Sequence, residues 1–199
     1  MRQSGIMDYR EFALGVLELV GGRPISFEVF SDEFDEMEKQ ALTIASWGNN
    51  VYVKIPITNT RRESCAALIQ KLGNQGININ VTAVMTLDQI SIAAKSLIDT
   101  PAGIISVFAG RIADTGRDPV PLMRAAKDLI AGSSNIELLW ASPRELLNIF
   151  HAEQAGSDII TVTHDMLRKL TGLGKDLEEF SLETVKMFYD DATRAGYSV

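Results

Sequence analysis

Short apolar segments alternate with amphipathic segments along almost the whole chain. Segments rich in β-branched residues, apolar on both faces, predict six strands covered by helices. These predicted strands are 24–30, 50–56, 78–85, 103–109, 136–142 and 158–163. The predicted helices are 8–20, 32–48, 61–76, 86–100, 118–133, 142–157 and 177–197. Strict alternation of strand and helix predicts an α/β fold with a parallel sheet.

The spacing of the strands favours a barrel. Their starting points recur at intervals close to the roughly 30 residues per unit of a (β/α)8 barrel. A doubly wound open sheet alternates in the same way, but its usual glycine-rich turn after the first strand is absent from this sequence. We therefore expect a (β/α)8 TIM barrel, of which about six strands are represented here, as a single domain over 1–199.

Composition and charge narrow the possible partners. With 199 residues, 46% hydrophobic and 23% charged, the chain resembles an ordinary globular domain. The net charge of −7 argues against a nucleic-acid partner, although a few arginines suffice to bind a small anion. A single cysteine, Cys65, excludes an intrachain disulfide and a thiolate metal site, and the two histidines are too few and too isolated for a zinc cluster. Without a signal peptide or an apolar run of roughly 18 residues, we expect a cytoplasmic protein with no membrane partner.

The predicted strand 50–56 contains one residue that does not fit an apolar pattern. Lys54 stands among strand-forming residues, where a charged amine is costly to bury. One interpretation is a lysine at the edge or the end of a strand, with its ammonium in water. The other is an amine facing the polar mouth of a barrel, where partial burial favours the neutral form and a neutral amine can attack a ketone. Pro56, suited to a strand end, favours the second, because barrel catalysis takes place at the carboxyl ends of strands.

Four segments share a recognisable pattern: "VYVKIPITN", "GININVTAV", "ISVFAGRIADTG" and "ASPRELLNIFHAEQAGSDIITV". Together they resemble the transaldolase family, in the short bacterial subgroup that includes fructose-6-phosphate aldolase, over about residues 5 to 180. The resemblance implies a barrel of the class I aldolase type with Lys54 as the Schiff-base lysine. It also implies sugar phosphates as substrates, no metal or organic cofactor, and a homo-oligomer in which 177–197 contacts a neighbouring subunit.

The resemblance also assigns the other catalytic residues. Glu28 takes the place of the strand-end acid that positions and activates a water during Schiff-base formation, and a carboxylate near an amine can shuttle protons. Asn80 and Thr82 alternate with Val81 and so share one strand face. They resemble the asparagine and threonine that hydrogen-bond the substrate hydroxyls and hold that water. Lys54, Glu28 and Thr82 are therefore the expected catalytic set.

Further residues resemble the family's substrate-binding residues. In "SVFAGR" these are Ser106, Phe108 and Arg111, with Arg111 as a phosphate ligand. In "ASPR" they are Ser142 and Arg144, just after the strand 136–142. Two arginines can hold a phosphate with several charge-assisted hydrogen bonds, and barrels commonly bind phosphate at their last strands. Apart from the resemblance, both arginines fit an ordinary solvated surface.

Two family features have no counterpart in this sequence. The family's first strand carries an aspartate, the acid/base for cleaving the carbon–carbon bond, and its second strand ends in a Thr-Asn-Pro motif. The resemblance therefore implies a barrel without its first two strands. Since strand number, tilt and shear are linked, six strands cannot close like eight, and we expect a distorted closure, a partner, or further residues.

The expected function is that of a transaldolase, which transfers a dihydroxyacetone unit between sugar phosphates through Lys54. One alternative is a fructose-6-phosphate aldolase that releases free dihydroxyacetone. Such aldolases tend to have glutamine in place of Glu28 and tyrosine in place of Phe108, so this pair favours transfer. The other alternative, supported by the missing aspartate, is a non-catalytic remnant that binds sugar phosphates or a partner.

Overall fold

The computed structural model describes residues 8–196. The chain divides into two compact units, residues 1–161 and residues 162–199. The first unit contains the whole sheet, and each unit is described by itself. The expected continuation of the N-terminal segment before residue 8, and of the last helix to residue 197, lies outside the described residues.

The first unit alternates strands and helices as the sequence predicts. Its strands are β1 (Ile25–Glu28), β2 (Val51–Pro56), β3 (Ile79–Val84), β4 (Gly103–Val107), β5 (Ile136–Trp140) and β6 (Ile159–Ile160). Its helices are α1 (Tyr9–Val20), α2 (Phe34–Ala45), α3 (Ala66–Gly73), α4 (Leu87–Ser96), α5 (Ala109–Ala113), α6 (Val120–Ile130) and α7 (Leu147–Gln154). Each of the six predicted strands is confirmed, with ends trimmed by one to several residues.

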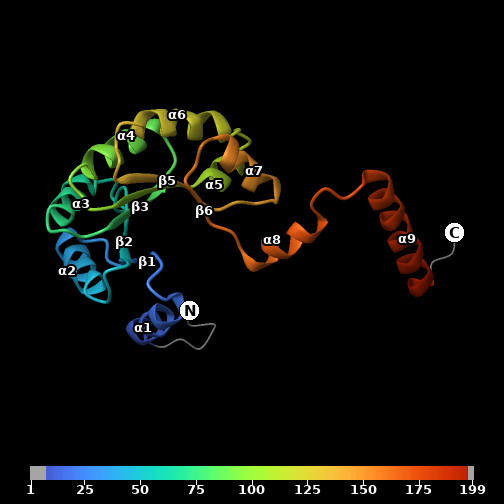
Figure 1. Ribbon diagram of the computed structural model, residues 1–199, viewed down its shortest axis with the longest axis horizontal. Coiled ribbons are helices and arrows are strands. Elements are labelled where there is room, and N and C mark those ends of the chain that lie inside the picture. The colour runs from blue at the N-terminus through green and yellow to red at the C-terminus, as the bar shows by residue number, and fades with distance from the viewer. Residues whose placement is uncertain (1–7, 197–199) are drawn as a thin grey trace. The chain divides into compact units, whose positions relative to one another are not determined.

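The six strands form one parallel sheet in the order β1-β2-β3-β4-β5-β6. The sheet is curled, and α2, α3, α4 and α6 follow its outer side (Figure 1). Sequential parallel strands with a crossover helix after each one are the architecture of a (β/α) barrel. The prediction of a TIM-barrel fold with about six strands is therefore confirmed as a partial barrel.

Local signals in the sequence fix where the helices begin and end. The Asp8 carboxylate accepts hydrogen bonds from the backbone N–H groups of Arg10 and Glu11, and Gly21, at φ 58°, ends α1. At α4, the Thr86 hydroxyl and the Gln89 side chain cap each other's backbone in a capping box. These contacts satisfy N–H groups that would otherwise lack partners at the first turn of each helix.

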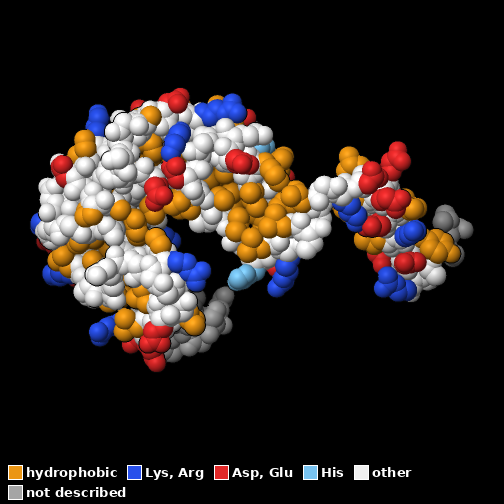
Figure 2. All heavy atoms as spheres, viewed as in Figure 1, with side chains coloured by type: hydrophobic (Ala, Val, Ile, Leu, Met, Phe, Trp, Pro, Cys, Tyr) orange, Lys and Arg blue, Asp and Glu red, His pale blue; other side chains and the backbone are white. Residues whose placement is uncertain are grey.

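The sheet has two differently packed faces. The outer face, which carries Val53 and Ile55 of β2, packs against the helices in the main hydrophobic core. The inner face holds a small apolar cluster of Tyr52, Ile104, Leu139 and Ala141. Figure 2 shows hydrophobic side chains along the inner side of the curved sheet. Alternate residues of one strand thus serve two different environments, as the pleat of a strand requires.

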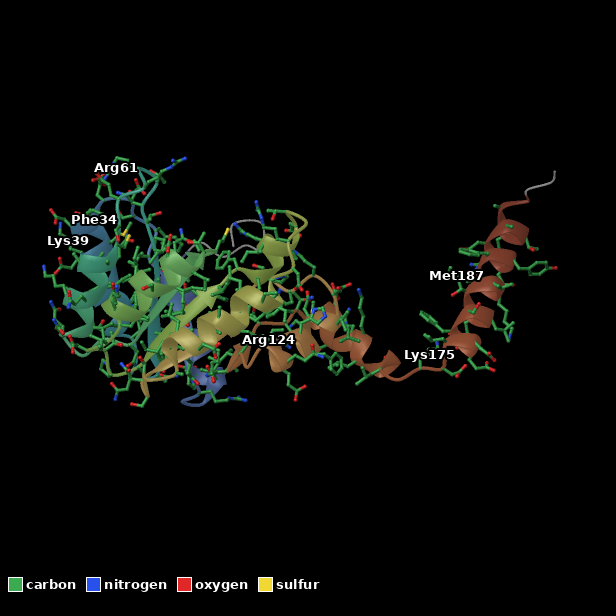
Figure 3. The ribbon with its side chains drawn as sticks, turned by 90° about the horizontal axis from the view of Figure 1, so that it is seen from above. Phe34, Lys39, Arg61, Arg124, Lys175 and Met187 are labelled. Carbon is green, nitrogen blue, oxygen red and sulfur yellow. The ribbon has the colours of Figure 1, made fainter. Side chains whose placement is uncertain are left out.

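The loop between β2 and α3 differs from the prediction, which placed a helix over 61–76. Thr58 and Ser64 form an isolated antiparallel bridge, and α3 begins only at Ala66. Arg61, at the exposed end of this loop (Figure 3), pairs with Glu33 through Nη1 at 2.7 Å. The Thr60 hydroxyl and backbone N–H both donate to the Asp32 carboxylate and lower its pKa. These contacts fasten the loop to the segment that follows β1.

The second unit contains α8 (His164–Lys169), a 3-10 turn (Leu170–Gly172) and α9 (Leu177–Ala195). The Asp176 carboxylate caps α9 by accepting from the N–H groups of Glu178 and Glu179. Large apolar side chains of α9 are exposed, among them Met187 (Figure 3). Among residues 8–196, no helix combines the length and apolar character that crossing a membrane requires.

Candidate active site

The register of the sheet places three polar residues in one row. Glu28 of β1 is the Cα partner of Lys54 of β2, and Lys54 is the partner of Asn80 of β3. Residues directly opposite on adjacent strands point to the same face and lie close together. An amine is thereby flanked by a carboxylate on one side and an amide on the other.

The same alternation explains why a lysine is tolerated within an apolar strand. Val53 and Ile55 are fully buried on the helix-covered outer face. Lys54 lies between them in sequence, so its side chain points to the inner face, where it is only partly buried. Lys54 does not lie on an edge strand, since β2 pairs with β1 on one side and β3 on the other.

A hydrogen-bond chain fixes the amide next to Lys54. The Asn80 Nδ2 donates to the Ser26 hydroxyl at 3.1 Å, and the Ser106 hydroxyl donates to the Asn80 Oδ1 at 2.7 Å. Asn80 and Ser106 are both buried. Because both ends of the amide are engaged, its orientation is set, and one Nδ2 hydrogen remains for a ligand.

A β-bulge follows Asn80 on β3. Val81 pairs with Ile105 and Val84 pairs with Val107, so β3 advances three residues where β4 advances two. Ala83 adopts φ 59°, in the left-handed region that non-glycine residues rarely occupy. The extra residue leaves Thr82 on the inner face and returns Val84 to the buried outer core.

A cavity of about 480 Å³ lies on the inner face, entirely within the first unit. Seven of the nine predicted site residues line it: Glu28, Lys54, Asn80, Thr82, Ser106, Phe108 and Ser142. Its other walls are Pro24, Ile25, Ser26, Leu139, Ala141 and Thr161. The cavity thus combines one amine, one carboxylate and several hydroxyls with an apolar floor.

The two predicted phosphate ligands do not line this cavity, but each is attached to its margin. The Arg111 guanidinium lies over the Phe108 ring, 5.0 Å from the ring centroid. Arg144 follows Ser142 by two residues and forms an ion pair with Asp114. Both guanidinium groups are therefore held near residues of the cavity rather than inside it.

The segment that joins the cavity to Arg144 has an unusual backbone. Ser142 adopts φ 59°, and Gly110 donates its N–H to the Ala141 carbonyl at 3.2 Å. A Cβ at position 110 would lie 1.5 Å from the Ser142 carbonyl oxygen. Glycine is thus required where the start of α5 passes this segment.

Two tyrosines border the polar row, and burial raises the pKa of each. The Tyr9 hydroxyl of α1 accepts a hydrogen bond from the Glu28 N–H at 3.2 Å. Burial is the main cause of the raised pKa of Tyr9, and the Glu28 charge adds to it. Tyr52 lies on the inner face two residues before Lys54. Burial is again the main cause of its raised pKa, and the Glu137 charge is the second.

The prediction from sequence missed two polar residues of the cavity, Ser26 and Thr161. Ser26 precedes Glu28 by two residues, so strand alternation alone puts both side chains on one face. That signal was available in "SFEVF". Thr161 follows the two-residue strand β6, which is too short to show any alternation.

The chemistry available is that of a nucleophilic amine with a proton shuttle. A carboxylate beside an amine can accept and return the proton that imine formation requires. Within residues 8–196, His, Cys, Asp and Glu side chains form no group of three that could hold a metal ion. The polar groups of the cavity suit a small polyhydroxylated molecule, since hydroxyls and amides both donate and accept.

Comparisons with known proteins agree with this arrangement. The family described as Transaldolase/Fructose-6-phosphate aldolase matches residues 9–199. A probable transaldolase of Methanococcus maripaludis is 31% identical over 185 residues, covering 89% of this chain and 82% of that protein. A probable transaldolase 2 of Listeria monocytogenes is 33% identical over 184 residues, covering 87% of this chain and 80% of that protein.

A third relative is matched over a smaller share of its length. The probable transaldolase of Nitrosopumilus maritimus is 32% identical over 148 residues, 73% of this chain, and the match spans 63% of that protein. The family match extends over all of the residues that form the sheet, the cavity and α9. The chain belongs to the transaldolase/fructose-6-phosphate aldolase family.

Proposed function

We propose that this protein is a transaldolase that transfers a dihydroxyacetone unit between sugar phosphates through a Schiff base on Lys54. The observation that carries the proposal is the row in which Lys54 stands between Glu28 and Asn80 on the inner face of the sheet. The cavity around this row also holds hydroxyl groups suited to a ketose.

In the proposed reaction, the neutral Lys54 amine attacks the ketone carbon of a ketose phosphate such as fructose 6-phosphate. The nitrogen loses protons, the former ketone oxygen gains them and leaves as water, and a C=N bond forms. Glu28, the cross-strand neighbour of Lys54, carries these protons, and the Thr82 hydroxyl holds the water. The protonated imine then accepts the electrons of the bond between carbons three and four.

Cleavage of that bond releases an aldose phosphate and leaves the three-carbon unit on Lys54 as an enamine. A second aldose phosphate accepts this unit, the new carbon–carbon bond forms, and water then releases the new ketose. The family's acid/base aspartate for the carbon–carbon step has no counterpart in this sequence. The proposal therefore gives the described residues the imine chemistry and assigns none of them to that proton transfer.

Substrate contacts follow from the same geometry. Asn80 has one amide hydrogen left after its bonds to Ser26 and Ser106, and can donate it to a substrate hydroxyl. Arg111 and Arg144, at the margin of the cavity, are the proposed ligands of the phosphate.

Two residues favour transfer over release of free dihydroxyacetone. Glu28 and Phe108 both line the cavity, and this pair resembles transaldolases rather than the free aldolases of the same family. The relatives described above are also named probable transaldolases. A second assay separates the two activities, because a free aldolase accumulates dihydroxyacetone from fructose 6-phosphate, whereas a transaldolase passes the three-carbon unit to an added aldose phosphate.

The decisive experiment is borohydride reduction of the protein with fructose 6-phosphate, followed by intact-mass and peptide mass spectrometry. We expect a reduced adduct on Lys54. A three-carbon adduct demonstrates both imine formation and cleavage, whereas an adduct of the whole ketose phosphate demonstrates imine formation alone.

Two variants act as controls. Lys54→Met removes the amine and is expected to abolish the adduct. Lys71→Met removes a lysine whose ammonium pairs with Glu38 at the helix layer, and is expected to leave the adduct unchanged. If the wild-type protein forms no adduct, or forms it equally in Lys54→Met, the proposed mechanism is wrong and the non-catalytic alternative is the better account.

A further inference from the structure

The Arg144 side chain is held by a carboxylate that the sequence did not single out. Its Nε lies 3.1 Å from Asp114 Oδ1, and its Nη2 lies 2.5 Å from Asp114 Oδ2. Two parallel N–H···O bonds of this kind fix the plane of the guanidinium as well as its position. Asp114 comes directly after α5, so this pair joins the segment after β4 to the segment after β5.

The pair uses only part of the guanidinium. Arginine has five N–H donors, of which Asp114 occupies one on Nε and one on Nη2. The two donors on Nη1 and the second donor on Nη2 remain, and one donor from each of these two nitrogens forms a second, end-on edge. That edge has the geometry to bind a second oxyanion such as a phosphate.

The backbone of Arg144 is fixed independently of its side chain. The Arg144 N–H donates to the Asn148 Oδ1 at 2.7 Å, and Asn148 is buried. Two residues earlier, Ser142 lines the cavity in a left-handed conformation. Arg144 is thus held at its backbone by Asn148 and at its guanidinium by Asp114, on a segment that leads out of the cavity.

We infer that Asp114 is a positioning residue, which holds Arg144 so that the free edge of its guanidinium receives the phosphate of the substrate. This inference rests on the proposed function for the identity of the substrate, and it explains how the protein selects phosphorylated sugars. The carboxylate acts through Arg144 and does not itself contact the substrate.

Asp114 has two opposing effects on the binding of phosphate. Its negative charge repels a phosphate, but both Asp114 and Arg144 are about half exposed, and water screens charges at such positions. A free arginine side chain loses rotamer freedom when it is fixed. Because the pair has already fixed Arg144, binding of phosphate avoids that loss, and we expect positioning to outweigh repulsion.

The test compares four proteins: wild type, Asp114→Asn, Asp114→Glu and the control Glu38→Gln. Asp114→Asn replaces one acceptor oxygen with an NH2 group and so breaks the two-bond fork. Asp114→Glu keeps the carboxylate. Glu38→Gln makes the same change of charge in the Lys71 ion pair between α2 and α3, outside the cavity.

The first measurement is the affinity for inorganic phosphate, by titration calorimetry. We expect Asp114→Asn to weaken it about tenfold, equivalent to about 1.4 kcal/mol, with partial recovery in Asp114→Glu and no change in Glu38→Gln. The second measurement is the sugar concentration that gives half-maximal borohydride trapping. We expect Asp114→Asn to raise it about tenfold for fructose 6-phosphate and by less than twofold for fructose, with the maximal trapping rate preserved.

Several results would overturn the inference. These are unchanged or tighter phosphate binding in Asp114→Asn, equal losses for both sugars, or no binding of phosphate by the wild-type protein. If phosphate binding weakens in Asp114→Asn as expected but no adduct forms on Lys54 in any variant, the proposed function fails while the role of Asp114 stands. The calorimetric measurement does not involve Lys54, so the two ideas can fail separately.

Discussion

Gly110 lies where two backbone segments of the site pass each other, and replacing it with alanine should damage both the fold and the cavity. The new Cβ would lie 1.5 Å from the carbonyl oxygen of Ser142 and 2.5 Å from its carbonyl carbon. An ordinary contact between carbon and oxygen is about 3.3 to 3.6 Å, so the two segments must separate by about 2 Å. No side chain can move aside to relieve this overlap, because the obstructing atoms belong to the backbone.

Two contributions lower the free energy of unfolding in Gly110→Ala. Overpacking in a close-packed region costs about 1 to 3 kcal/mol or more, and a backbone neighbour places this substitution at the upper end. The hydrogen bond from the Gly110 N–H to the Ala141 carbonyl is lost as the segments separate, at about 1 kcal/mol. We therefore expect the free energy of unfolding to fall by about 4 kcal/mol.

Urea denaturation followed by tryptophan fluorescence measures this change in the first unit alone. Trp47 and Trp140 are the two tryptophans of the chain, and both lie before residue 162. With an m value near 2 kcal/mol/M, the midpoint should fall by about 2 M. Gly15→Ala is the matched control, since a Cβ there meets no atom within 4 Å in the middle of α1, and it should gain roughly 0.5 to 1 kcal/mol. A midpoint of Gly110→Ala equal to that of the wild type would refute the packing described for this crossing.

Three further substitutions test separate parts of the first unit by the same denaturation assay. Asn80→Ala should cost about 1 to 3 kcal/mol, because the buried Ser106 hydroxyl loses its acceptor, and the double variant with Ser106→Ala should recover part of the loss. Burial raises the pKa of the Cys65 thiol from 9.0 to about 11, so stability should hold below pH 9 and fall between pH 9 and 11, where the unfolded chain releases its thiol proton first. That loss should become smaller in Cys65→Ala, while the part caused by the raised pKa values of Tyr9 and Tyr52 remains. A Cys65→Ala variant with the same pH dependence as the wild type would contradict the role of the thiol. Ala83→Gly should change stability by less than about 1 kcal/mol, since relief of the left-handed conformation opposes the greater freedom of unfolded glycine, and a large loss would show that the Ala83 methyl packs in the fold.

Most of the fold could be predicted because strand and helix patterns are local. All six strands and the helices around them follow from the alternation of apolar segments with amphipathic ones. The exceptions are elements that local patterns describe poorly. The five residues of α5 and the six of α8 are too short to show a helical repeat. The late start of α3 depends on contacts of Thr60 and Arg61 with residues 28 positions earlier in the chain.

Some residues of the site could likewise be predicted from the sequence, and others could not. Glu28, Lys54 and Asn80 could be found because strand ends of a barrel converge and the family resemblance marks them. The partner of Arg144 could not, since Asp114 is 30 residues away along the chain and only the approach of α5 to the segment after β5 brings the two together. Their roles in catalysis stay predictions until the adduct and phosphate experiments are made.

The bulge on β3 has a consequence for how sequences of this family should be aligned and redesigned. Up to Thr82 the even-numbered residues of β3 face the cavity, whereas after Ala83 an even-numbered residue, Val84, enters the core between sheet and helices. A related chain that lacks this one residue would still place Val84 in the core, because the residue after Thr82 in a regular strand faces the outer side. An alignment therefore keeps the two sets of side chains distinct only if its gap falls at Ala83. The position of a gap within this strand is therefore as informative about the active site as the identity of the residues beside it.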